Sequence, residues 1–88
     1  MHLYGSVVKD NQAIPDAVTL VMDLKVNDNG ILFIAASYTE DFDEIEPGCT
    51  IPFRSWGYFC ARSGADDVET AYNYLLGMDE FSGQSIRE

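Results

Sequence analysis

Acidic side chains are concentrated in one short segment, residues 40–46, where five of the seven residues are Asp or Glu. Carboxylates at this density can attract Lys and Arg side chains of a partner protein, or can simply keep a small domain in solution. The other two residues, Phe42 and Ile45, favour partner binding, because a binding hot spot combines an apolar anchor with a charged rim. They could equally tether the segment to the core. We predict partner contacts by Glu40, Asp41, Phe42, Asp43, Glu44 and Glu46.

A second acidic group, Asp79 and Glu80, follows the C-terminal end of an expected helix. Negative charge there opposes the helix dipole at a cost of roughly a few tenths of a kcal/mol, which favours a use in binding. Asp66, Asp67 and Glu69, at the start of the same helix, are explained as capping residues. If the loop and both helix ends share a face, their carboxylates could imitate a phosphate backbone. We therefore add Asp79 and Glu80 to the predicted contact surface.

Metal binding and catalysis find little support in the residues present. The acids lack the D-x-[DN]-x-[DN]-G spacing of a calcium loop, and residues 27–30 (NDNG) are better explained as a hairpin turn. Cys49, Cys60 and His2 are too few for a zinc site. A catalytic Cys–His pair would depend on the same terminal His2. We therefore expect no catalytic residue, no metal, no cofactor and no enzyme activity.

The net charge limits the class of partner. The chain has 15 acidic and 5 basic residues and a formal charge of −10. Residues 40–88 hold eleven of the acids and three arginines, a net of −8. Such a field attracts basic proteins and repels DNA, RNA and anionic lipid, so we expect a basic protein partner and no direct nucleic-acid or membrane contact. An aromatic run (Trp56, Tyr58, Phe59) between arginines could stack on bases, but the charge favours core packing instead.

Length and composition predict one small acidic domain, 1–88. The N-terminal sequence lacks the basic and apolar regions of a signal peptide, and no apolar run approaches the roughly 20 residues of a membrane span. We therefore expect a cytoplasmic protein whose Cys49 and Cys60 are reduced. A disulfide between them stays open, because it requires geometry that the sequence does not supply.

Four segments have the pattern of β-strands: 2–9, 17–26, 31–38 and 56–62. In the second strand, alternation is expected to place one set of side chains on a common face, namely Val18, Leu20, Met22, Leu24 and Val26. Asn29-Gly30 predicts a hairpin turn into the third strand, which is apolar on both faces as expected of a central strand. Residues 11–16, which include Pro15, are expected to form a loop, and Pro47-Gly48 a turn.

One helix is predicted near the C-terminus. Asp66 is suited to cap it, and an inner face follows at helical spacing, formed by Val68, Ala71, Tyr72 and Leu75. Gly77 is expected at its C-terminal cap, and residues 82–88 are expected to be frayed. The order of elements predicts an α+β fold, with a small antiparallel sheet of about four strands and one C-terminal helix packed on one face.

These features predict a small acidic inhibitor that covers a basic, nucleic-acid-binding surface of a larger protein. In size, acidity and lack of catalytic motifs, the chain is similar to phage-encoded antagonists of bacterial defence, including anti-CRISPR and anti-restriction proteins. An immunity protein or antitoxin that neutralises a basic nuclease toxin would use the same surface. A structural or assembly subunit is a further alternative, because strands 31–38 and 56–62 could extend a sheet between copies in a homo-oligomer.

Overall fold

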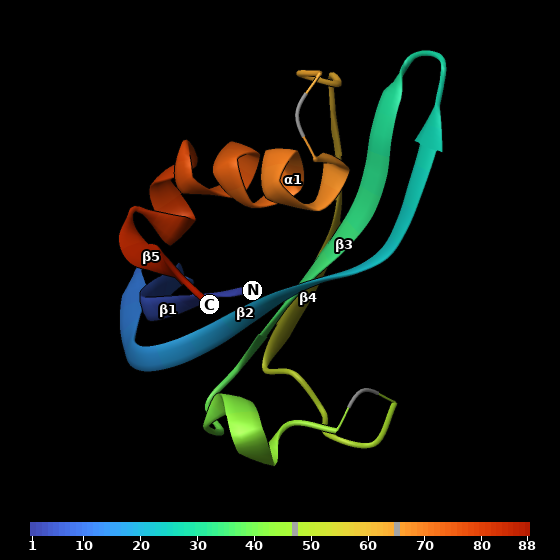
Figure 1. The fold of residues 1–88 in the computed structure, drawn as a ribbon. Coiled ribbons are helices and arrows are strands. Elements are labelled where there is room, and N and C mark those ends of the chain that lie inside the picture. The colour runs from blue at the N-terminus through green and yellow to red at the C-terminus, as the bar shows by residue number, and fades with distance from the viewer. Residues whose placement is uncertain (47, 65) are drawn as a thin grey trace.

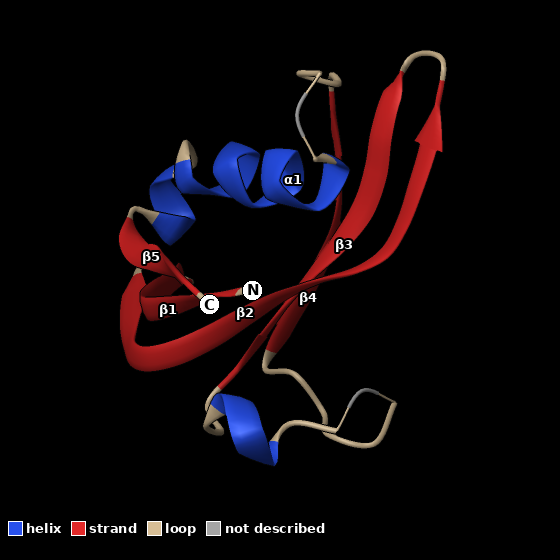
Figure 2. Ribbon diagram, in the orientation of Figure 1, coloured by secondary structure: helices blue, strands red, loops and turns tan. Residues whose placement is uncertain are grey.

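The computed structural model describes residues 1–46, 48–64 and 66–88. Over these residues, five antiparallel strands form one sheet in the order β4-β3-β2-β1-β5, and an α-helix packs across one face (Figure 1). The elements are β1 (His2–Lys9), β2 (Gln12–Asn27), β3 (Gly30–Tyr38), η1 (Phe42–Glu44), β4 (Arg54–Cys60), α1 (Asp67–Leu76), η2 (Asp79–Phe81) and β5 (Gly83–Arg87). The fold is of the α+β class (Figure 2), with one strand more than the sequence predicts.

The extra strand is β5, so the prediction of a frayed end over residues 82–88 is wrong. β5 pairs antiparallel with β1. The side-chain amide of Gln84 donates a hydrogen bond to the carbonyl oxygen of Ala17 at 3.0 Å. Gly5 permits the close approach of β1 and β5, because a Cβ at this position would collide with the carbonyl oxygen of Gly83. The short polar sequence of β5 has no strand pattern of its own, and its order comes from these tertiary contacts.

The loop predicted over residues 11–16 is also wrong, because β2 begins at Gln12 and the chain reverses at Asp10-Asn11. Both turn residues have positive φ, at 52° and 65°, as a two-residue hairpin of the primed type requires. Pro15 fits within the strand because the register against β1 shifts here. Such a bulge accepts a residue that cannot donate to the ladder.

A second bulge in β2 overturns the predicted strict alternation of residues 17–26. Asp23 has φ 51°, and the register against β3 shifts between Met22 and Lys25. The extra residue moves Leu24 from the face of Met22 to the face of Val21, where it packs against the larger core cluster. The predicted hairpin that follows is confirmed. Its turn is held by Asn27, whose side-chain oxygen accepts hydrogen bonds from the backbone N–H groups of Asn29 and Gly30, at 2.8 and 3.1 Å.

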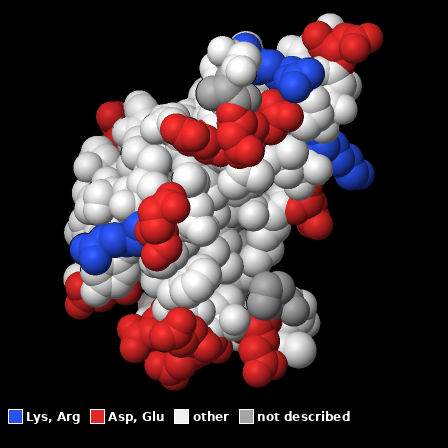
Figure 3. All heavy atoms as spheres, viewed as in Figure 1, with Lys and Arg blue, Asp and Glu red and all other residues white. Residues whose placement is uncertain are grey.

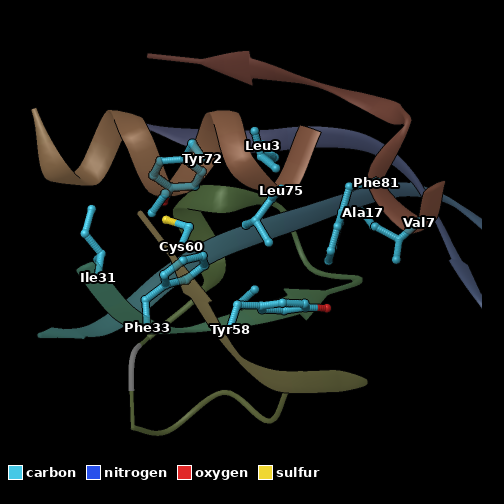
Figure 4. Close-up of a cluster of buried hydrophobic side chains, with 12 residues drawn as sticks. Leu3, Val7, Ala17, Ile31, Phe33, Tyr58, Cys60, Tyr72, Leu75 and Phe81 are labelled. Atoms are coloured by element: carbon cyan, nitrogen blue, oxygen red, sulfur yellow. The ribbon is translucent and has the colours of Figure 1, made fainter. Parts of the chain in front are cut away.

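The larger core cluster lies between the sheet and the α1–η2 layer. Tyr72, Leu75 and Phe81 point from that layer toward Phe33 and Tyr58 on the sheet (Figure 4). Asp66 caps α1 as predicted, since its side chain accepts from the backbone N–H groups of the second and third helical residues. The inner face of the helix is confirmed for Ala71, Tyr72 and Leu75, whereas Val68 is exposed.

The prediction that the aromatic run packs in the core holds for one of its three residues. Tyr58 is buried, but Trp56 is 65% exposed and Phe59 is 49% exposed. The reason is the position of the strand, because β4 lies at the edge of the sheet and has no strand on its outer side among the described residues. Trp56 is therefore open on the α1 face, and Phe59 on the opposite face. The predicted bounds of 56–62 are also displaced, since β4 runs from Arg54 to Cys60.

Candidate partner-binding site

The acidic segment 40–46 is held against the sheet face opposite α1 (Figure 1). Ile45 is only 8% exposed and belongs to a smaller apolar cluster with Val18, Ala36 and Tyr38. The Phe42 ring stacks on the His2 ring, with centroids 4.2 Å apart and planes 13° apart. Both apolar residues therefore tether the segment, and Phe42 is still 43% exposed and accessible to a partner.

The end of the segment is fixed by a pair of hydrogen bonds. The backbone N–H of Glu46 donates to the Thr50 hydroxyl at 2.8 Å, and the backbone N–H of Thr50 donates to the Glu46 carbonyl at 2.8 Å. Gly48 follows in a turn with φ 86°, while Pro47, the other residue of the predicted turn, lies outside the described residues. The carboxylates thus project from a short, well-anchored stretch of backbone.

The five carboxylates of the segment 40–46 form no ion pair with a basic side chain among the described residues. Over residues 1–46, 48–64 and 66–88, the structure contains two ion pairs, Arg54–Glu80 and Arg62–Asp67, and neither includes a residue of this segment. Figure 3 shows the resulting concentration of acidic side chains over η1, at the lower end of the molecule. Charge that is anchored, exposed and unpaired is suited to attract a basic partner.

A groove of about 610 Å³ lies beside the acidic segment. It forms where β1 ends, because β1 pairs with β2 up to Leu3↔Thr19 and leaves the following part of β2 without a neighbour on that side. The groove is mainly apolar, and it is lined by Met1, Leu20, Val21, Met22, Phe42, Asp43, Ile45, Val68 and Tyr72. It could therefore accept an apolar side chain of a partner.

Tyr72 closes the inner end of this groove. Its hydroxyl accepts a hydrogen bond from the backbone N–H of Val21 at 3.0 Å and donates one to the carbonyl oxygen of Met1 at 3.1 Å. Burial raises the pKa of the Tyr72 hydroxyl, which keeps it protonated and able to donate. The interaction satisfies a backbone group of β2 and one of Met1, which precedes β1, at the point where the β1–β2 ladder stops.

The opposite rim of the groove belongs to the start of α1. Val68 lines the groove and lies in the same helical turn as Asp67 and Glu69. Figure 3 shows acidic side chains over this part of α1 as well, with uncharged surface between them and the group over η1. The groove is therefore mainly apolar, with the acidic segment 40–46 on one side and Val68 of α1 on the other. From the sequence, Asp66, Asp67 and Glu69 are explained first as capping residues and second as part of a phosphate-like surface. The exposure of Val68 between them is visible only in the structure.

Asp79 and Glu80 lie on the other side of the sheet from the segment 40–46. Glu80 accepts a hydrogen bond from the Arg54 guanidinium at 2.8 Å, and Arg54 lies over the Phe81 ring of the α1-side cluster. The structure therefore does not bring the two predicted acidic groups together. As expected, Asp79 and Glu80 follow the end of α1, which ends at Leu76 with Gly77 as its cap.

His2 supports the segment from β1. Its pKa is lowered from the usual 6.5 mainly by burial, with smaller contributions from the N-terminal ammonium and Arg87, while Asp43 acts in the opposite direction. At neutral pH the imidazole is therefore uncharged, and it packs on Phe42 as a flat, partly buried ring. The neutral His2 ring therefore forms one side of the tether of Phe42.

Comparison with known proteins found no matching family model, no matching curated protein and no matching solved structure.

Cys49 is an exposed free thiol and Cys60 a buried one. Burial raises the pKa of the Cys60 thiol, so it stays protonated at neutral pH. Within the described residues, no group of three or more His, Cys, Asp or Glu side chains could hold a metal ion, and no helix is long and apolar enough to cross a membrane.

Proposed function

We propose that the protein inhibits a larger protein by covering one of its basic surfaces with the segment 40–46 and the adjoining groove. The observation that carries this proposal is a set of five carboxylates, with no ion pair among the described residues, on an anchored segment beside an apolar groove. Exposed acids alone would serve solubility equally well. An apolar groove beside the acidic segment adds a place where binding energy can be gained.

The two parts of this surface have different physical roles. The carboxylates raise the association rate by attracting Lys and Arg side chains over several ångströms, an effect that salt screens. The groove and the exposed part of Phe42 hold the complex together, because apolar contacts buried at the centre of an interface slow dissociation. The matching partner surface has an apolar side chain flanked by basic residues.

Proteins that handle nucleic acids are natural targets, because their binding grooves are basic. A phage-type antagonist of bacterial defence, such as an anti-CRISPR, would occupy such a groove and exclude the nucleic acid. An immunity protein or antitoxin that neutralises a basic nuclease toxin would use the same surface. The identity of the partner separates these two targets.

Affinity capture with matched charge variants tests the proposal. The variant Asp41→Asn, Asp43→Asn, Glu44→Gln removes three negative charges from the segment 40–46. The control Asp10→Asn, Asp23→Asn, Asp28→Asn removes the same charge elsewhere, and Asn tolerates the positive φ found at two of these positions. We expect the wild-type protein and the control to retain one stoichiometric nucleic-acid-binding protein from a host lysate, and the segment variant to lose it. Equal retention of the partner by all three proteins would contradict the assignment of the segment 40–46 as the binding surface.

A further inference from the structure

Strand β4 lies in the longest part of the sequence that has no acidic residue. From residue 47 to residue 65 there is no Asp or Glu, although the other parts of the chain contain all 15. The two basic residues of this stretch, Arg54 and Arg62, form ion pairs with Glu80 and Asp67 of the same chain, at 2.8 and 3.2 Å. A chain with net charge −10 therefore has an electrically neutral strand at the edge of its sheet.

The side chains of β4 are apolar and exposed on both faces of the sheet. Trp56 is 65% exposed on the α1 side, where it pairs with Ala35 of β3. Phe59 is 49% exposed on the opposite face, beside the 48% exposed Leu32 of β3. Large apolar side chains at these positions gain little from the fold, whereas they would be buried against another strand.

The edge also lacks the features that prevent strands from pairing. Natural edge strands carry Lys, Pro or inward-pointing charges, or are very short. The opposite edge, β5, follows this rule, since it has five residues, contains Arg87 and is followed by Glu88. β4 has seven residues, and within it Arg54 is the one charged side chain and is already paired. Its outer backbone groups have no strand partner among the described residues.

We propose that β4 pairs antiparallel with β4 of a second copy of this chain, which joins the two sheets across a two-fold axis near Gly57. The charge distribution selects this occupant. Two copies with net charge −10 repel each other wherever their acids face, and β4 is the neutral edge where they can meet. A basic partner is attracted by the acidic surface instead. Self-pairing about a two-fold axis is antiparallel by symmetry, and an axis at Gly57 places Trp56 of one copy opposite Tyr58 of the other on the α1 side of the joined sheet.

The native fluorescence of the protein reports on this interface, because Trp56 is the only tryptophan in the chain. Pairing would bury its indole, so its emission should shift to shorter wavelength as concentration rises. Sedimentation of the same samples should show the mass doubling over a range of about 1 to 500 µM. Higher salt should favour the dimer, since it screens the repulsion between the two chains.

Two lysine substitutions complete the test. Trp56→Lys places a charge on the edge strand, and we expect it to abolish the doubling of the mass. Val26→Lys makes the same change at an exposed position on β2, and it should dimerise as the wild type does. If circular dichroism shows that Trp56→Lys does not fold, Phe59→Lys serves as the test variant, because it places the charge on the other face of the same strand. A monomer at all concentrations in high salt, a dimer that survives the lysine on β4, or a dimer without any change in Trp56 emission would each overturn the proposal.

Discussion

The acidic segment 40–46 and strand β4 are separated by seven residues in the chain, yet their surfaces are opposites. The first contains five carboxylates without an ion pair among the described residues, and two side chains, Phe42 and Ile45, attach it to the sheet. The second is neutral and apolar, and a register of seven residue pairs attaches it to β3. The protein therefore keeps its charge away from its open edge.

This difference shows that the net charge of −10 is an incomplete description of the molecule. Evenly spread acids would make the whole surface repel other copies and attract basic proteins equally. Segregated acids allow two kinds of contact, one driven by charge and one by apolar burial. The two regions also differ in how they are held, which makes their contributions to stability separable.

The largest expected effect comes from a cavity in the larger core cluster, which also contains Tyr58 and Cys60 of β4. Phe81 is fully buried in the α1-side cluster. Phe81→Ala should lower the free energy of unfolding by about 3–5 kcal/mol, because it leaves a cavity under α1. Urea unfolding measures this loss. A loss below about 1 kcal/mol, the size expected of an exposed position, would show that the α1 layer is not the support of the sheet.

A smaller and more local effect is expected from Ile45→Ala. The loss of this side chain from the smaller cluster should cost about 2–3 kcal/mol. It should also detach the acidic segment, so that amide hydrogen exchange accelerates in residues 39–46 and stays slow in β4. Equal acceleration in both regions would break the comparison, since it would mean that the two regions are not held independently.

Salt is expected to stabilise the fold through the unpaired acids. From about 20 to 300 mM salt, the melting temperature should rise by a few degrees as repulsion within the segment is screened. The segment triple variant, with three charges removed, should show a flatter rise than the control triple of residues 10, 23 and 28. The same slope in both variants would indicate that repulsion is spread over the molecule and not concentrated in residues 40–46.

The smallest effect concerns pH and the tether of Phe42. The pKa of His2 is lower in the folded protein than its usual 6.5, so below pH 6.5 the unfolded chain binds a proton that the folded chain resists. Stability should therefore decrease as pH falls from 6.5 toward the folded pKa. His2→Phe keeps a ring against Phe42 without a titrating group, and should flatten the dependence between about pH 7.5 and 5.5. An equally steep decrease in this variant would assign the effect to the carboxylates.

The sequence predicts those parts of the fold that depend on local chemistry. The hairpin at Asn27–Gly30, the Asp66 cap and the central position of β3 follow from residue type and periodicity. The bulge at Asp23 does not, because a positive φ at a non-glycine residue depends on its neighbours in the sheet. The sequence does not predict β5 for a similar reason, because this strand forms only through its pairing with β1.

The candidate site is foreseen in part. The density of acids identifies the segment 40–46, and the choice of Phe42 and Ile45 as anchors or tethers could be resolved only by their contacts. The groove depends on where β1 stops beside β2, which no sequence pattern states. The exposure of Trp56 follows from strand order, and strand order is set by the whole fold.

The salt dependence of the association rate with the captured partner tests the central claim most directly. For the wild-type protein and the control triple, the logarithm of the rate constant should fall steeply with rising ionic strength, because the segment 40–46 attracts the partner. For the variant Asp41→Asn, Asp43→Asn, Glu44→Gln, the rate should be lower at low salt and its decline should be flatter. Identical rates and slopes for both triple variants would contradict the claim that this segment is the binding surface.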